Sequence, residues 1–386
     1  MIFPIQEFEN IETPFYYYDL KLLESTLKAI KEAAHYANYH VHYAVKANAN
    51  PEILRVIQQA GLGVDCVSGG EIKAALDMGF DPSDIVFAGV GKSDREIEYA
   101  LKSGIGCFNV ESIPELEVIQ MIASRLGCNA NVALRVNPDI DAHTHHYITT
   151  GLEENKFGIS MQMLEKAISY CYAQPNVKLT GLHFHIGSQI TTNEPFRILC
   201  ERINDLVKQF AEKGVVFTSI NVGGGLGIDY DDPDRNPIPD FKDYFDTFNK
   251  YLKLSPEQHL HFELGRSIVA QCGSLITRVL YVKEGLKKKF VIVDAGMTDL
   301  IRPALYQAHH KIENITSKSD VTDIYDVVGP ICESSDCFGQ DETLPLTKRG
   351  DLLALRSAGA YGEIMASQYN LRELPASFYD LPGEKK

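Results

Sequence analysis

A lysine closes one of the apolar stretches of the chain, in the run His42-Tyr43-Ala44-Val45-Lys46-Ala47-Asn48. A charged amine at the inner end of a buried strand is uncommon unless it is paired, exposed at a rim or covalently engaged. A neutral lysine amine is also a nucleophile that forms Schiff bases with carbonyl compounds. The run therefore predicts either a covalently engaged Lys46 or an ordinary solvated lysine, and spacing alone does not separate the two.

A run of glycines, Gly223-Gly224-Gly225-Leu226-Gly227, follows the strand-like residues 220–222. Successive glycines let backbone N–H groups approach an anion closely, so such a run can form a nest of the size of a phosphate. Ile228 comes next and no Gly-Lys-Ser/Thr sequence follows, so the run matches neither the Rossmann nor the P-loop pattern. The run predicts a phosphate site, with a flexible turn as the alternative.

Two histidines, His183 and His185, stand two positions apart in a strand-like run and therefore face the same side of it. Paired histidines on a barrel strand can bind zinc, but no comparable set of carboxylate ligands accompanies them, and we expect no metal. Ser188 follows closely and adds a small hydroxyl that could hold a phosphate.

A carboxylate ends another strand-like run, in Glu263-Leu264-Gly265-Arg266. A buried carboxylate needs a cation or a proton-bearing partner, because burying it alone is strongly unfavourable. A protonated pyridine nitrogen would serve as that partner. An internal ion pair with Arg266 is the alternative, and the pattern leaves both open.

The elements that position these residues alternate along the first two thirds of the chain. From residue 15 to about 265 the period of the hydrophobic pattern changes repeatedly between near 2 and near 3.6. The strand-like runs are 41–47, 63–67, 85–88, 107–110, 132–136, 179–186, 218–222 and 259–263. The helical stretches are 20–37, 51–60, 71–78, 95–101, 113–125, 161–172 and 195–212. Eight strands separated by helices are typical of a (β/α)8 barrel of the TIM type, whereas a doubly wound sheet usually has fewer.

The hydrophobic pattern changes after about residue 268, where few helical stretches remain. Strands are expected at 269–282, 290–293, 323–328 and 351–355, which indicates an antiparallel β-sandwich or β-barrel domain. We expect the (β/α)8 barrel domain to span 15–265. The β domain is expected to combine residues 1–14, which could add a strand, with residues 266–386. The long polar loop 137–155 has the character of a lid or binding loop.

The composition restricts the partners that the chain can have. With 37 Lys plus Arg against 52 Asp plus Glu, the formal net charge is −15, which argues against binding nucleic acid or an anionic membrane. No apolar run is long enough for a transmembrane helix, and the first residues do not resemble a signal peptide. The eight cysteines form no CxxC pair, so we expect reduced thiols and a cytoplasmic location.

Taken together, the motifs resemble the pyridoxal-phosphate-dependent decarboxylases of the alanine-racemase-like fold, over nearly the whole chain. The stretches that carry the resemblance are Tyr43-Ala44-Val45-Lys46-Ala47-Asn48, Asn155-Lys156-Phe157-Gly158, His185-Ile186-Gly187-Ser188-Gln189, Gly223-Gly224-Gly225, Glu263-Leu264-Gly265-Arg266, Ile301-Arg302-Pro303-Ala304-Leu305-Tyr306, Cys332-Glu333-Ser334 and Gly359-Ala360-Tyr361-Gly362. Each stretch is weakly specific alone, but eight in this order are strongly specific. Two departures are Leu264, where the family often has proline, and Ser335, where glycine is usual.

The resemblance implies a set of cofactor-binding residues. Lys46 would carry pyridoxal 5′-phosphate as a Schiff base, Glu263 would keep the ring nitrogen protonated, and His185 would lie against the ring. The phosphate would be held by Ser188, Gly224, Gly225, Gly265 and Arg266. Tyr361 would close over the cofactor from the β domain.

The resemblance also implies a substrate and a reaction. The substrate would be met by Arg266, Arg302, Tyr306, Glu333 and Tyr361. A guanidinium fork suits a carboxylate, and a distal ammonium needs an anion, so the pattern favours meso-2,6-diaminopimelate. Decarboxylation at its D-centre, with Cys332 protonating the carbanion, would give L-lysine and CO2, the last step of lysine biosynthesis. Cys332 and Glu333 would come from the partner subunit of a homodimer.

Other functions stay open at this point. A related decarboxylase could act on ornithine, arginine or carboxynorspermidine, but ornithine has no distal carboxylate for Arg302. A non-enzymatic pyridoxal-phosphate carrier would share the barrel and its lysine but not a β domain with a Cys-Glu pair. A racemase would need a tyrosine opposite Lys46, where the family pattern places Cys332.

Overall fold

The computed structural model describes residues 1–138 and 156–380. Its contacts divide the chain into two compact units, one made of residues 27–227 and 240–265 and the other of residues 1–26, 228–239 and 266–386. Most of the predicted binding loop 137–155 lies outside the described residues. No helix in the described ranges is long and apolar enough to cross a membrane. The predicted domain boundaries at 14/15 and 265/266 stay a prediction, because a division by contacts does not show which segments fold independently.

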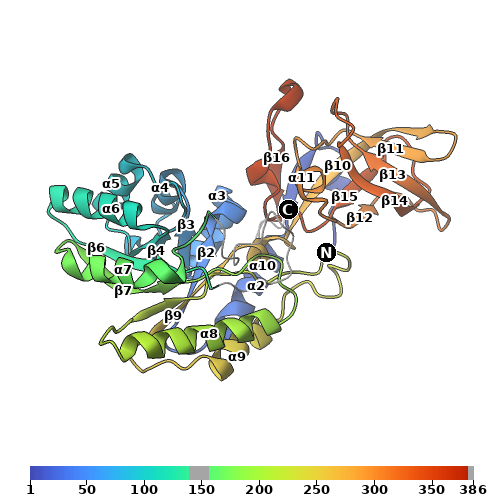
Figure 1. Cartoon of the computed structure of the whole chain (residues 1–386). Coiled ribbons are helices and arrows are strands. Elements are labelled where there is room, and N and C mark those ends of the chain that lie inside the picture. The colour runs from blue at the N-terminus through green and yellow to red at the C-terminus, as the bar shows by residue number, and fades with distance from the viewer. Residues whose placement is uncertain (139–155, 381–386) are drawn as a thin grey trace. The chain divides into compact units, whose positions relative to one another are not determined.

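The first unit contains a closed barrel of parallel strands, β2 to β9, in sequence order (Figure 1). The strands are β2 Tyr39–Ala44, β3 Gly63–Cys66, β4 Ile85–Phe87, β5 Cys107–Val110, β6 Ala130–Arg135, β7 Val177–His183, β8 Ser219–Asn221 and β9 His259–Leu264. Strand β2 pairs with both β3 and β9, and this pairing closes the barrel. The predicted (β/α)8 architecture is confirmed.

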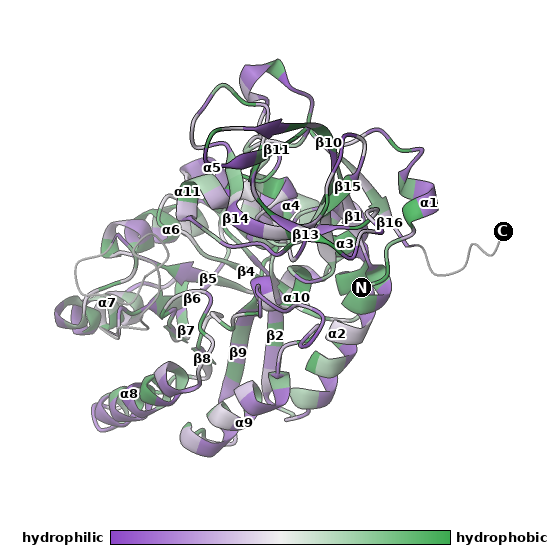
Figure 2. Ribbon diagram, turned by 90° about the vertical axis from the view of Figure 1, so that its right-hand side faces the viewer, coloured by the Kyte–Doolittle hydropathy of each residue, from purple (hydrophilic) through white to green (hydrophobic). Residues whose placement is uncertain are grey.

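Helices follow most of the barrel strands in the described ranges. They are α3 Pro51–Gln59, α4 Gly69–Asp77, α5 Asp94–Ser103, α6 Ile113–Leu126, α7 Met161–Ala173, α8 Glu194–Ala211 and α9 Phe241–Tyr251, whereas α2 Leu20–Ala33 precedes β2. Their ends follow local chemistry: Ser93 and Glu96 form a capping box at the start of α5, and Gly104 ends it in the left-handed conformation. Hydrophilic and hydrophobic residues alternate along the whole of α8 (Figure 2), because one side of an amphipathic helix packs on the barrel and the other faces outward.

The second unit is built on a mostly antiparallel sheet. The strands are β1 Phe15–Tyr18, β10 Gly273–Glu284, β11 Lys289–Val293, β12 Ile312–Asn314, β13 Thr322–Val328, β14 Cys337–Pro345, β15 Leu352–Leu355 and β16 Ala376–Tyr379. They run in the order β12-β15-β10-β11-β13-β14, and β1 pairs with β10 and β16. The β11–β13 and β1–β16 pairs are parallel. The predicted β domain is therefore confirmed as a fold class.

Two details of this unit differ from the sequence prediction. The strand expected from residue 269 begins at Gly273, because the short helix α10, Arg266–Val269, occupies the preceding residues. The segment before residue 15 contains the short helix α1, Ile5–Phe8, and not a strand. Phe8 packs edge-on against Phe15 and Tyr17, so α1 covers one side of β1 with aromatic rings.

Candidate active-site residues

Lys46 lies in a single 3-10 turn, Val45–Ala47, directly after β2. The predicted strand 41–47 therefore ends at residue 44, and the lysine stands at the carboxyl end of a barrel strand, where barrel active sites form. Its Nζ donates to Oδ2 of Asp65 over 2.5 Å, and Asp65 is fully buried at the third position of β3. Burial and the nearby charge of Glu263 raise the pKa of Asp65 to about 6. The site thus pairs a half-buried amine with a carboxylate that is costly to ionise.

The carboxylate of Glu263 is buried at the end of β9 and receives three hydrogen bonds from three other strands. Asn109 of β5 and Asn221 of β8 donate to Oε1 over 2.9 and 2.8 Å. His183 of β7 donates to Oε2 over 3.0 Å. Burial alone would raise the pKa of Glu263, but the hydrogen bond and charge of His183 and the charge of Lys46 outweigh it and lower the pKa. Glu263 is therefore an anion at neutral pH.

His185 follows β7 and is half-buried. Burial, assisted by the positive charges of Arg135 and Lys46, lowers the pKa of His185 to about 3, so the imidazole is neutral at neutral pH. Its Nδ1 accepts a long hydrogen bond of 3.4 Å from the N–H of Gly224. Arg135 is itself held by a buried 2.7 Å ion pair with Glu111. A neutral, fixed imidazole can lie flat against an aromatic ring without adding charge.

The glycines near these residues are required by close packing. A Cβ on Gly224 would lie 1.9 Å from the carbonyl oxygen of Glu263, and a Cβ on Gly265 would lie 3.1 Å from the Cβ of Ala47. Gly225 has a φ of 108°, which L side chains rarely adopt. Ser188 is half-buried on the loop that follows β7. The glycine run therefore holds the backbone against its neighbouring strands, whether or not it also binds phosphate.

In the second unit, Arg266 and Arg302 meet at one side chain that the sequence did not suggest. Arg266 opens α10, and Arg302 opens the short helix α11, Arg302–Tyr306; both are buried, with 6% exposed. Their Nη1 atoms donate to the hydroxyl oxygen of Tyr230 over 2.6 and 2.8 Å. The guanidinium of Arg266 also stacks 5.0 Å from the ring centre of Tyr361. The ion pair between Glu263 and Arg266, the alternative raised by the sequence, stays a prediction.

Tyr361 and Tyr306 are both half-buried. Tyr361 has a φ of 57°, a left-handed conformation that costs a non-glycine residue energy and is retained mainly at functional sites. Tyr306 ends α11 and contributes to the electrostatic environment of Arg266. The structure therefore brings four predicted residues, Arg266, Arg302, Tyr306 and Tyr361, into one neighbourhood of the second unit.

Cys332 and Glu333 lie on the loop 329–336 between β13 and β14, and both are exposed. The loop is ordered by the buried carboxylate of Asp336, which accepts from the N–H of Met297 over 2.6 Å and of Ile331 over 2.7 Å. Tyr369 donates to Glu333 over 2.7 Å. The pair is thus presented outward by a fixed loop.

Sequence reasoning missed several residues of both groups. They are Asp65, Asn109 and Asn221 in the barrel, and Tyr230 and His310 in the second unit. His183 was noted only as half of a candidate metal pair, and no grouping of three or more ligating side chains that could hold a metal occurs in the described ranges. For the barrel residues, the available signal was a polar residue inside an apolar run, as Asp65 is in Gly63-Val64-Asp65-Cys66.

The barrel fold and the lysine, carboxylate and glycine set together define a class of protein. The sequence pattern of the family described as "Pyridoxal-dependent decarboxylase, pyridoxal binding domain" matches residues 20–270, so the chain belongs to the pyridoxal-dependent decarboxylases. It is an enzyme of this class, and its cofactor is pyridoxal 5′-phosphate. The predicted family is confirmed.

Similar proteins narrow the family further. The chain is 62% identical to a diaminopimelate decarboxylase of Bacteroides thetaiotaomicron, with 98% of each chain covered. It is 47% identical to a diaminopimelate decarboxylase of Neisseria meningitidis serogroup B, over 95% of this chain and 88% of that one. The crystal structure of diaminopimelate decarboxylase from Helicobacter pylori complexed with L-lysine superposes with a TM-score of 0.91 at 42% identity, over 97% and 93% of the two chains.

The barrel residues fit this cofactor. Oε2 of Glu263 accepts one hydrogen bond in the described ranges, and a carboxylate oxygen can accept two, so it can take another from a protonated ring nitrogen. Oδ1 of Asp65 is buried without a described partner beside the lysine amine. The neutral imidazole of His185 suits the face of an aromatic ring. A pyridinium aldehyde requires an amine, an anion and a neutral ring, and Lys46, Glu263 and His185 supply these three groups.

Proposed function

We propose that this chain decarboxylates meso-2,6-diaminopimelate at its D-centre and releases L-lysine and CO2. The observation that carries the proposal is the pair of buried guanidiniums, Arg266 and Arg302, both within 2.8 Å of one tyrosine oxygen. Buried cations of this kind favour a substrate with a carboxylate besides the one that is lost. The relatives named above, which carry the name diaminopimelate decarboxylase, support the same substrate.

In this proposal the barrel residues prepare the cofactor. Pyridoxal 5′-phosphate supplies an electron sink for the carbon that loses CO2. Lys46 supplies the amine that anchors it, Glu263 keeps its ring nitrogen protonated, and His185 covers the ring as a neutral group. Asp65 accepts a hydrogen bond from the amine of Lys46 and so fixes the direction in which that side chain points. Ser188, Gly224, Gly225 and Gly265 are proposed to hold the phosphate, with Arg266.

The residues of the second unit recognise the substrate. Arg302 binds the carboxylate at the L-centre, Tyr306 supports it, and Glu333 faces the ammonium beside it. Tyr361 closes over the cofactor with its ring, which stacks on the guanidinium of Arg266. Cys332 donates the proton that replaces CO2 on the D-centre carbon. These roles follow the family pattern, and each matches the charge or hydrogen-bonding capacity of the side chain.

We also propose a homodimer in which Cys332 and Glu333 of one subunit act in the site of the other. Their exposure on a loop ordered by Asp336 supports this arrangement, because an exposed pair can serve a second copy of the chain. A cytoplasmic location is proposed as well. It agrees with the eight free cysteines, since thiols stay reduced there.

The deciding experiment compares CO2 release from meso-diaminopimelate, L-lysine, L-ornithine and L-arginine by the purified holoenzyme. We expect release from meso-diaminopimelate alone, with L-lysine as the product. Lys46→Ala is the control and should lose both CO2 release and the visible absorbance of the bound cofactor. Preference for ornithine or arginine would replace the proposed substrate while leaving the family unchanged.

A further inference from the structure

Tyr230 occupies an unusual electrostatic position in the second unit. Its hydroxyl oxygen accepts from Arg266 and Arg302, and the two guanidinium carbons lie 5.9 and 5.2 Å from the centre of its ring. Two cations that share one oxygen repel each other, and burial strengthens that repulsion. The acceptor therefore holds together two groups that would otherwise move apart.

The titration behaviour of these groups reflects that position. Burial alone would raise the pKa of Tyr230, but the two guanidiniums outweigh it and lower the pKa. Burial lowers the pKa of Arg302, and the charge of Arg266 lowers it further. The pKa of Tyr230 therefore depends on both arginines, and the pKa of Arg302 depends on Arg266.

His310 fixes Arg302 from the other side. Nη1 of Arg302 lies 3.1 Å from Nε2 of His310, and a guanidinium can only donate, so Nε2 is the acceptor. Nδ1 then carries the hydrogen and donates it to the carbonyl oxygen of Arg356 over 2.9 Å. Burial and the charge of Arg302 lower the pKa of His310 to about 3, which keeps this neutral tautomer in place. Arg302 is therefore aimed by two acceptors, Tyr230 and His310.

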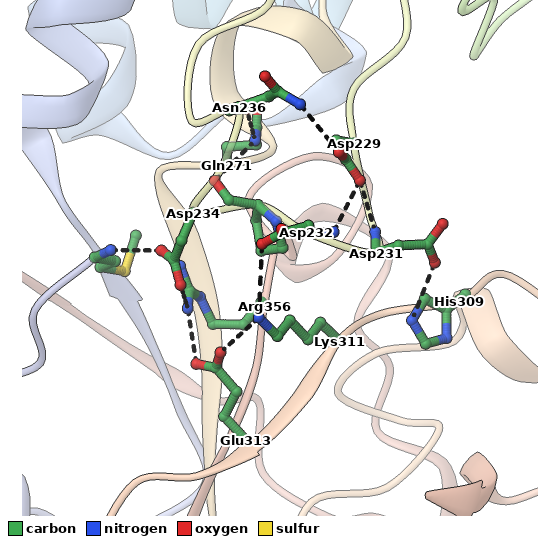
Figure 3. A network of polar contacts seen from close by, with 12 residues as sticks. Asp229, Asp231, Asp232, Asp234, Asn236, Gln271, His309, Lys311, Glu313 and Arg356 are labelled. Carbon is green, nitrogen blue, oxygen red and sulfur yellow. Dashed lines mark hydrogen bonds and ion pairs between the residues drawn. The ribbon is translucent and has the colours of Figure 1, made fainter. Parts of the chain in front are cut away.

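The loop that carries Tyr230 is anchored by the same arginine whose carbonyl accepts from His310. Arg356 donates to Asp234 from Nη1 over 3.1 Å and from Nη2 over 2.8 Å, and its Nη1 also reaches Glu313 over 2.7 Å (Figure 3). Gln271 donates to the carbonyl oxygen of Asn236 over 2.7 Å at the far end of the loop.

Within the loop, Asp229 accepts from the N–H groups of Asp231 and Asp232 over 3.0 and 2.8 Å. Tyr230 thus stands on a loop that is braced from inside by Asp229 and from outside by Arg356. This bracing restrains the backbone that carries its side chain, so Tyr230 offers the two guanidiniums a fixed point of contact.

We propose that Tyr230 is a positioning residue for substrate recognition, tying Arg266 and Arg302 to one point so that they present a single carboxylate-binding edge. The inference rests on the proposed function, since it assumes that a substrate carboxylate binds these arginines. Tyr230 can accept from both arginines and still offer its hydroxyl hydrogen, for which no acceptor is described in the ranges 1–138 and 156–380. An anion bound to both arginines could receive that hydrogen as well.

The test compares Tyr230→Phe with Tyr244→Phe. The control removes a buried hydroxyl of α9 that has no hydrogen-bond partner in the described ranges. Binding to each holoenzyme is measured by calorimetry for L-lysine and for cadaverine, the same diamine without a carboxylate. In Tyr230→Phe we expect the Kd for L-lysine to rise about tenfold while that for cadaverine stays unchanged. The KM for meso-diaminopimelate should rise by a similar factor, and kcat should change less than about threefold.

Asp234→Asn provides a second variant should Tyr230→Phe not fold. It keeps Tyr230 but weakens the anchor of the loop, so the Kd for L-lysine should rise about threefold with that for cadaverine unchanged. Unchanged binding of L-lysine to Tyr230→Phe would overturn the inference. If Tyr230→Phe does not fold, unchanged binding of L-lysine to Asp234→Asn would overturn it. A wild-type enzyme that binds both ligands equally would overturn it too, and CO2 release from meso-diaminopimelate then tests the proposed function separately.

Discussion

The Nζ atom of Lys46 lies 2.5 Å from Oδ2 of Asp65, a carboxylate with no exposed side-chain surface. The lysine side chain itself is 38% exposed. The two partners therefore depend on the pair unequally. Solvent can hydrate the lysine amine if Asp65 is removed, but it does not reach the carboxylate if Lys46 is removed.

Replacing Lys46 should destabilise the apoprotein in a pH-dependent way. The pKa of Asp65 is raised to about 6, so its contribution to stability is greatest at low pH and is lost as the pH rises through about 6. Lys46→Ala removes a cation that lowers this pKa. We expect a loss in the free energy of unfolding of about 1–3 kcal/mol at pH 8 and a smaller loss at pH 5.

Urea unfolding of the apoproteins at both pH values measures this difference. The double variant Lys46→Ala/Asp65→Asn should recover most of the loss at pH 8, because it no longer buries an unpaired charge. An equal loss at pH 5 and pH 8 would contradict the assignment of Asp65 as the group responsible.

His183→Gln should change the pH dependence of the reaction. The hydrogen bond and charge of His183 help to hold the pKa of Glu263 below its ordinary value, against the effect of burial. Without the imidazole, burial dominates and the carboxylate takes up a proton at higher pH. We expect the acid limb of kcat/KM to move up by about one pH unit or more. His35→Gln, at an exposed position just after α2, is the control and should leave the profile in place.

Mixing two inactive variants tests the shared site. Lys46→Ala lacks the anchoring amine and Cys332→Ala lacks the proposed proton donor. If Cys332 serves the partner, random mixed dimers contain one intact site, and an equal mixture should regain about one quarter of the wild-type activity. Separate refolding followed by late mixing is the control, since it forms no mixed dimers. No recovery after co-refolding, with dimers present, would place Cys332 in its own subunit's site.

Arg302→Lys should weaken substrate binding more than turnover. Lysine keeps the charge but not the planar fork that meets a carboxylate with two parallel bonds. We expect the KM for meso-diaminopimelate to rise at least about tenfold. Arg349→Lys, at an exposed position of the same unit, is the matched control. A KM within a factor of about two of the wild type would argue against carboxylate binding by Arg302.

Much of the fold could be predicted because the barrel repeats one local pattern. Each buried strand gives an apolar run, and each covering helix gives a period near 3.6, so the eight strands could be located within a few residues. Lys46 and Glu263 were found because a charged residue at the end of such a run conflicts with burial. That conflict is a local signal, visible without any knowledge of the fold.

The partners of those charges could not be found in the same way. Asn109 and Glu263 are 154 positions apart, and only closure of the barrel brings their side chains within 2.9 Å. Asn221 and Asp65 look like ordinary polar interruptions of a strand. Tyr230 lies in a stretch with neither helical nor strand period, so nothing in its surroundings marks it as the common acceptor of two arginines.

The second unit is assembled from three separated segments, and this has a consequence for synthesis. Asp234 precedes its partner Arg356 by 122 positions. At translation rates of about 5–20 residues per second, the arginine is made roughly 6–24 seconds after the aspartate. During that interval the nascent chain carries Asp234 before the arginine that pairs with it exists. A chain truncated after the barrel would carry Asp234 without this arginine, and the loop that holds Tyr230 would lose that anchor.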